Sequence, residues 1–204
     1  MNKEYLAYFL LILTTMFWSG NFILGKFSAL FLVPPFSLNF FRWLLVWLIL
    51  IPFTIKEIIQ NLEFIKKNFK ILFILGITSI SSFNSIVYYS LNFTQVINAV
   101  LMLSAIPVLT IAISSVLKID KIKIMQIYGL LISIFGVAII ITKADLGLIL
   151  SLNFNKGDLW MILAALSWSI YSAFLKKITL PFSQFSLIQV ISTIGLIFLI
   201  PQFY

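Results

Sequence analysis

Apolar residues occur along the chain in seven long stretches, separated by short links that contain charged residues, Gly or Pro. Each stretch has about 20 residues, the length of helix that crosses the hydrocarbon core of a bilayer. The stretches lie at about residues 5–25, 36–55, 69–91, 95–117, 124–142, 159–178 and 183–203. The pattern therefore predicts an all-α integral membrane protein with seven transmembrane helices.

The later part of the chain repeats features of its beginning at a nearly constant offset of 150 and then 149 residues. The matched pairs are Trp18 and Trp168, Ser19 and Ser169, Lys26 and Lys176, 36–38 and 185–187, and 51–52 and 200–201. A shared order of these residue types indicates an internal repeat, which decides the architecture of the chain. We expect residues 1–145 to form a first unit of five helices and residues 146–204 to form the first two helices of a second unit.

Basic residues are divided unequally between the two sets of links. The N-terminus and the links at 56–70, 118–123 and 176–177 carry 10 Lys, whereas the opposite set carries 4 Lys or Arg. By the positive-inside rule, the richer set is cytoplasmic. We therefore predict a multi-pass protein of the cytoplasmic membrane with its N-terminus inside.

The two units should enter the membrane from opposite sides, because five helices, an odd number, separate their starts. Such inverted-topology pairs are typical of many secondary transporters. Two complete units would form a ten-helix fold of about 300 residues, so we expect the 204-residue chain to be truncated at its C-terminal end. Without a three-helix continuation, we expect a homodimer to complete the carrier.

Composition excludes several classes of function. The chain is 62% hydrophobic and 10% charged, whereas soluble domains are about 45–50% apolar and about 25% charged. Without Cys or His, it lacks thiolate and imidazole ligands and the usual general base. Its six acids lie in links or at helix ends, and no phosphate-binding Gly-rich motif occurs. We expect no enzyme, no cofactor and no metal.

The net charge of +8 does not indicate a nucleic-acid partner, because the basic residues are spread over the links rather than gathered on one face of a domain. The expected partners are the lipid bilayer and a small-molecule substrate.

Polar side chains within the predicted helices are the candidates for a substrate site, because in lipid they tend to face the interior of the bundle. Asn21, Asn84 and Asn98 are the most informative, since an amide is costly to bury. Tyr88 follows Asn84 by four residues and so lies on the same helix face. The alternative for the many Ser and Thr residues is packing between helices.

Arg42 is the only arginine of the chain and lies near the outer end of the second predicted helix. Its guanidinium could orient an anionic group at the outer mouth, or it could extend to the external headgroups. Trp18, Trp168 and Tyr171 are aromatic candidates from the two units. The alternative for the tryptophans is an interfacial belt, although both lie nearer the middle of their helices.

Several segments resemble an EamA-type transporter of the drug/metabolite transporter superfamily. They are FWSGNFILGK at 17–26, FSLNFFRWLL at 36–45, VYYSLNFTQVINAVLMLSAIPVLTIAISSVL at 87–117, IYGLLISIFGVAII at 127–140 and GDLWMILAALSWSIYSAFLKK at 157–177. The resemblance implies ten helices in two inverted five-helix repeats, cytoplasmic termini and movement of small metabolites, often outward.

We interpret the chain as a carrier of small amphipathic solutes, such as amino acids, that works by alternating access, with export as the expected direction. The substrate would lie between the two units. The expected binding residues are Trp18, Asn21, Arg42, Asn84, Tyr88, Asn98, Trp168 and Tyr171. The alternatives are a seven-helix membrane receptor and a non-transporting membrane scaffold.

Overall fold

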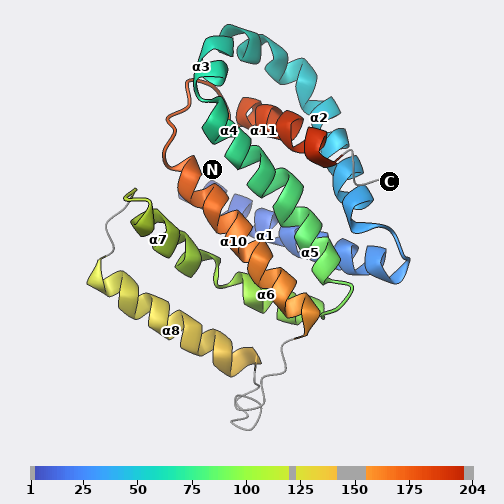
Figure 1. Cartoon of the computed structure of the whole chain (residues 1–204), viewed down its shortest axis with the longest axis vertical. Helices are drawn as coiled ribbons and strands as arrows, with labels where there is room; N and C mark the ends of the chain where they lie inside the picture. The colour runs from blue at the N-terminus through green and yellow to red at the C-terminus, as the bar shows by residue number, and fades with distance from the viewer. Residues whose placement is uncertain (1–2, 120–122, 142–154, 200–204) are drawn as a thin grey trace.

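The computed structural model describes residues 3–119, 123–141 and 155–199, and these residues form helices joined by short links, without strands (Figure 1). The first predicted unit contributes α1 (Lys3–Leu30), α2 (Pro35–Gln60), α3 (Leu62–Lys67), α4 (Phe69–Gly76), η1 (Ile77–Phe83), α5 (Asn84–Ser90), α6 (Val96–Leu103), α7 (Ile106–Val116) and α8 (Ile124–Ile141). The second contributes α10 (Lys156–Leu175) and α11 (Gln184–Leu199). The prediction of an all-helical protein is confirmed.

Among the described residues, five helical segments are long and apolar enough to cross a membrane. They are Glu4–Leu30, Pro35–Gln60, Phe69–Ser90, Val96–Val116 and Lys156–Leu175. The other two predicted stretches correspond to α8 and to α11, which has 16 residues. The count of seven spans and the inverted arrangement remain predictions, and the expected boundary between the units at residues 145 and 146 lies outside the described residues, as does the 200–201 part of the repeat.

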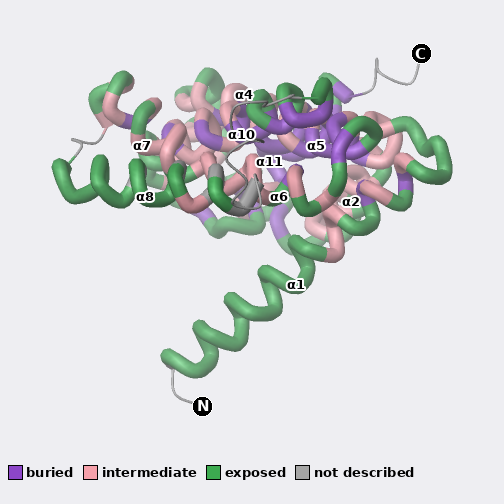
Figure 2. Tube along the Cα trace, turned by 90° about the horizontal axis from the view of Figure 1, so that it is seen from below, coloured by how far each residue is buried: buried purple, intermediate pink, exposed green. Residues whose placement is uncertain are grey.

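Helices α10 and α11 of the second predicted unit pack among those of the first. Helix α10 contacts η1, α5, α6 and α7, whereas α11 contacts α2, α4 and η1 (Figure 1). Helix α1 contacts this bundle through its C-terminal half only. Residues 4–19 are exposed, and the N-terminal part of α1 extends away from the other helices (Figure 2).

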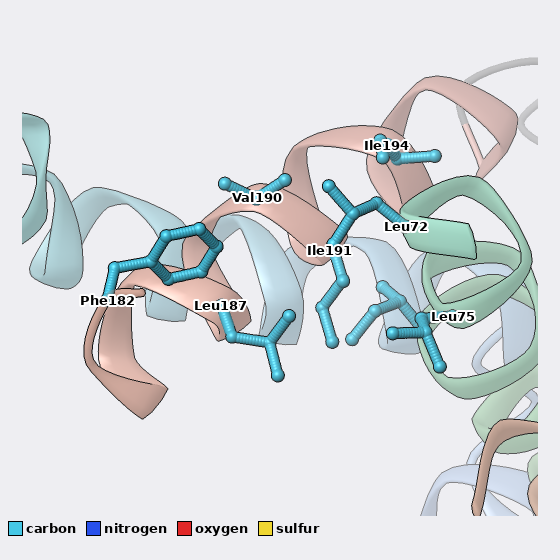
Figure 3. Packing of buried hydrophobic residues seen from close by; sticks show 8 residues of the cluster. Leu72, Leu75, Phe182, Leu187, Val190, Ile191 and Ile194 are labelled. Carbon is cyan, nitrogen blue, oxygen red and sulfur yellow. The ribbon is translucent and has the colours of Figure 1, made fainter. Parts of the chain in front are cut away.

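Two groups of buried apolar side chains hold the bundle together. The first joins α4 and η1 to α11 and consists of Leu72, Leu75, Ile80, Phe182, Leu187, Val190, Ile191 and Ile194 (Figure 3). The second joins α5 and α6 to α10 and consists of Val87, Tyr88, Leu91, Ala99, Met161 and Ala164. Both groups combine residues from the two predicted units, so the units share one core.

The π-helix η1 interrupts the third apolar stretch. A π-turn pairs each N–H with the carbonyl five residues back. Side chains of other helices bind the carbonyls of η1: Asn39 of α2 donates to the Ile80 carbonyl at 2.8 Å, and Ser167 of α10 donates to the Thr78 carbonyl at 2.8 Å. Helix η1 is therefore fixed by both predicted units.

The fourth apolar stretch is divided into α6 and α7 at Ser104 and Ala105. Pro107 lies in the first turn of α7, where its missing N–H costs no helical hydrogen bond. A break is thus found where a proline inside a long apolar helix is expected to disturb it.

Helix α11 crosses α4 and η1 closely at two glycines. A Cβ atom on Gly195 would lie 2.4 Å from the Cβ atom of Ile80, and one on Gly76 would lie 2.8 Å from the Ile191 carbonyl oxygen. We expect Gly195→Ala to lower the free energy of unfolding by about 1–3 kcal/mol, because the buried Ile80 has to shift. Urea or SDS titration of the protein in detergent measures this change.

Gly20→Ala is the matched control, since a Cβ atom at Gly20 meets no atom within 4 Å. Equal stability of the two variants would contradict the close crossing.

Candidate functional site

Four predicted site residues meet in a hydrogen-bonded group, the Arg42 cluster, which consists of Asn21 of α1, Arg42 of α2, and Asn84 and Tyr88 of α5. Arg42 Nη1 donates to Asn21 Oδ1 and to the Tyr88 hydroxyl. Arg42 Nη2 donates to Asn84 Oδ1 at 3.3 Å, and the Tyr88 hydroxyl donates to Asn21 Oδ1 at 2.6 Å. The prediction that these residues belong together is consistent with this geometry, although a role in binding is not thereby tested.

Local helix geometry places these side chains. Asn84 and Tyr88 are one turn apart and therefore project from the same face of α5, toward Arg42. Tyr88 and Asn84 are buried, whereas Asn21 and Arg42 are half-buried. The guanidinium carbon of Arg42 also lies 5.5 Å from the Trp43 ring centroid and 5.7 Å from that of Tyr88, within the range of a cation–π contact.

Beside the Arg42 cluster lie four aromatic rings, the aromatic cluster, which consists of Trp18, Phe83, Trp168 and Tyr171. Trp168 is at its centre: its ring centroid lies 6.3 Å from Trp18, 4.5 Å from Phe83 and 4.9 Å from Tyr171. Phe83 directly precedes Asn84, and Trp18 lies one turn before Asn21. The polar and aromatic clusters are therefore neighbours where α1, η1, α5 and α10 meet.

Asn98 is the one predicted site residue that the structure does not bring into either cluster. It is half-buried on α6 and makes no hydrogen bond within the described part of the chain. Sequence reasoning missed Phe83, whose position next to Asn84 was the available signal. It also missed Asn39, which donates both to η1 and to the Ser85 hydroxyl at 2.9 Å.

One end of the bundle is held by a polar network around the link between α5 and α6. Lys26 Nζ donates to the carbonyls of Leu91 and Thr94 at 2.8 and 2.9 Å. The Thr94 hydroxyl in turn donates to Asp158 Oδ1 at 2.9 Å, and Asp158 forms a capping box with Asn155 at the start of α10. This network joins the two predicted units at that end.

At another point of contact between the units, Glu57 of α2 accepts hydrogen bonds from the link that precedes α11. The Ser183 N–H donates to Glu57 Oε1 at 2.8 Å, and the hydroxyls of Ser183 and Ser186 donate to Glu57 Oε2. A carboxylate is favourable here because it faces the N-terminus of a helix. Glu57 thus fixes the start of α11 against α2.

A cavity of about 500 Å³ lies between the end of α10 and the start of α11. Tyr171 of the aromatic cluster lines it, together with residues of the link such as Ile178 and Leu180. The cavity therefore connects the aromatic cluster with this link. Across the described ranges, no group of His, Cys, Asp or Glu side chains is arranged to hold a metal ion.

Comparison with known proteins identifies one family. The model of the EamA-like transporter family matches residues 5–142, which confirms the resemblance drawn from the sequence. No solved structure matches the chain.

Three similar relatives are described as uncharacterized transporters. One is YyaM of Bacillus subtilis (strain 168), which is 26% identical over 199 residues that cover 96% of this chain and 65% of the relative. Another, from Archaeoglobus fulgidus, is 27% identical over 203 residues that cover 98% of this chain and 67% of the relative. A third, from Clostridium kluyveri, is covered over 56% of its length, so the chain spans between about half and two thirds of the curated relatives it matches.

The Tyr88 hydroxyl bridges α1, α2 and α5 within the Arg42 cluster. We expect Tyr88→Phe to lower the free energy of unfolding by about 1–2 kcal/mol, because Arg42 and Asn21 each lose a hydrogen-bond partner in a buried setting. Tyr89→Phe is the control: the Tyr89 ring packs on Phe93 and Trp160, and its hydroxyl makes no hydrogen bond within the described residues. Thermal unfolding in detergent compares the two variants, and equal losses would contradict the bridging role.

Proposed function

The chain belongs to the EamA-like transporter family, and on this basis we propose that it acts in a secondary transporter that carries small amphipathic, amino-acid-like solutes out of the cell by alternating access. Family membership and the names of the relatives indicate a multi-pass membrane transporter rather than an enzyme. They also favour transport over the receptor and scaffold alternatives.

The observation that carries this proposal is the convergence of the Arg42 cluster and the aromatic cluster at the meeting of the two predicted units. Trp168 and Tyr171 come from α10, whereas the other members come from α1, α2, η1 and α5. A site between two units would change its exposure when the units move relative to each other. Aromatic rings beside amides and a guanidinium suit a solute with an apolar body and a polar head.

Alternating access requires contacts between the units on both sides of the site, and these contacts have to break alternately. Thr94 and Asp158 form such a contact on one side of the site, and Glu57 with Ser183 forms another. In the proposed cycle, one of these contacts opens while the other stays closed. The cavity beside Tyr171 is the proposed approach from the link between α10 and α11.

Counterflow in proteoliposomes tests transport directly. Vesicles with the purified chain are loaded with unlabelled leucine or phenylalanine, and uptake of the labelled amino acid is measured. We expect Trp168→Ala to reduce the initial rate about two- to tenfold, because aromatic contacts of about 0.5–1.5 kcal/mol are lost. Trp160→Ala is the control, since Trp160 packs on Tyr89 outside the aromatic cluster. Absence of counterflow in the unsubstituted chain would contradict the proposal.

Accessibility tests the cycle without a known substrate, because the chain has no native cysteine. A single cysteine at Asn21 should react with a membrane-impermeant thiol reagent from either side of the membrane. A single cysteine at Ala164 should react from neither side, since Ala164 is 0% exposed on the face of α10 that packs against α5 and α6. Labelling of the Asn21 variant from one side only, or from none, would contradict alternating access at this site.

A further inference from the structure

The Arg42 guanidinium is held by neutral groups alone. Its described partners are the oxygens of Asn21, Tyr88 and Asn84, which accept hydrogen bonds but supply no negative charge. A half-buried cation without a counter-charge is unfavourable in a low-dielectric setting. The cluster therefore orients a positive charge without neutralising it.

The acids of the neighbouring helices are engaged elsewhere. Glu57 of α2 binds Ser183 and Ser186, and Asp158 of α10 binds Thr94 and caps its own helix. Lys26, the basic residue near the C-terminal end of α1, donates to the carbonyls of Leu91 and Thr94. Arg42 is thus the one cation among the described residues of the Arg42 cluster. The cluster can therefore balance a single negative charge on a bound solute.

The hydrogen bonds of Arg42 leave donors free for a further partner. A guanidinium has five N–H groups, and those that bind the cluster are on Nη1 and Nη2. No hydrogen bond from Nε occurs within the described residues. A planar guanidinium with free N–H groups is well suited to a carboxylate, which it can bind through two parallel hydrogen bonds.

The surroundings of Arg42 specify the rest of the solute. Phe83, which directly precedes Asn84, and Trp18, one turn before Asn21, belong to the aromatic cluster. Its exposed edge is Trp18, with 59% of its surface accessible. An apolar or aromatic body attached to the charged head would lie against these rings.

We propose that Arg42 binds the single carboxylate of amino-acid-like solutes with an apolar body, and that its charge excludes solutes whose head carries a cation but no carboxylate. This inference rests on the proposed function, because it assigns the charge of the transported solute. A phosphate monoester, with up to two negative charges, would call for a second cation that the Arg42 cluster does not contain.

Three probes with the same ring and different heads test the inference: phenylacetate, phenethyl alcohol and phenethylamine. Their apparent affinities for the detergent-solubilised chain follow from the rise in unfolding temperature over a concentration series. We expect phenylacetate to bind about tenfold more tightly than phenethylamine, because a charge-assisted hydrogen bond replaces a like-charge contact. Phenethyl alcohol should lie between them.

Asn21→Asp separates binding from structural support. Asn21 accepts both of its described hydrogen bonds through Oδ1, so an aspartate keeps them and adds an internal counter-charge for Arg42. We expect this variant to be at least as stable as the unsubstituted chain and to lose about tenfold in affinity for phenylacetate. Gln126→Glu is the control, because Gln126 is exposed on α8, away from the Arg42 cluster. Like Asn21, Gln126 accepts its described hydrogen bond through the side-chain oxygen, here from the Lys123 N–H.

Equal affinity for the three probes, tightest binding of phenethylamine, or no stabilisation by any probe would each overturn the inference. Unchanged phenylacetate affinity in a folded Asn21→Asp variant would do the same and would leave Arg42 a structural cross-link. If that variant does not fold, the probe series on the unsubstituted chain decides. Counterflow of leucine or phenylalanine together with equal probe affinities would preserve the proposed function and reject only the charge selectivity.

Discussion

Polar groups between the helices of a membrane protein find partners on other helices, because the hydrocarbon around the bundle supplies none. In this chain the partners are often backbone carbonyls of the opposite predicted unit. Ser81 donates to the Gly195 carbonyl and Ser90 to the Gly157 carbonyl, at 2.8 and 2.7 Å. Each such bond fixes one helix against another, and together with the two apolar groups they make the helices of both units one packed body.

The Arg42 cluster follows the same constraint with a different result. Helices α1 and α5 contribute the neutral oxygens that accept from Arg42 of α2. The guanidinium is therefore oriented by hydrogen bonds while its charge persists. The aromatic cluster beside it packs through rings alone. A polar, charged region and an apolar region thus meet at one place, where Trp168 of α10 packs against Trp18 and Phe83 of the first predicted unit. The hydrogen bonds of Thr94 with Asp158 and of Glu57 with Ser183 join the units outside this place.

The sequence predicts much of this arrangement because membrane helices follow strong rules of length and polarity. The seven apolar stretches coincide with helices, and the rule that polar side chains face the interior brings Asn21, Arg42, Asn84 and Tyr88 together. The rule does not place Asn98, which lies outside both clusters, because the cost of burying an amide does not specify which neighbouring helix the amide faces. Phe83 could not be singled out by type among 21 phenylalanines, and its role depends on packing against Trp168.

The seven residues of η1 determine the direction, about the helix axis, in which the later side chains of the third apolar stretch project. A π-turn holds one residue more than the α-helical turn it replaces, and each residue of an α-helix advances the side chains by about 100°. The face that α5 presents to α2 is therefore determined by a turn that begins two helical turns earlier. Loss or gain of a single residue between Ile77 and Phe83 would change the phase of α5 and direct Asn84 and Tyr88 away from the guanidinium, without any change in the residues of the cluster itself. In this chain, the length of that short segment determines the geometry of the Arg42 cluster as much as the identity of its side chains does.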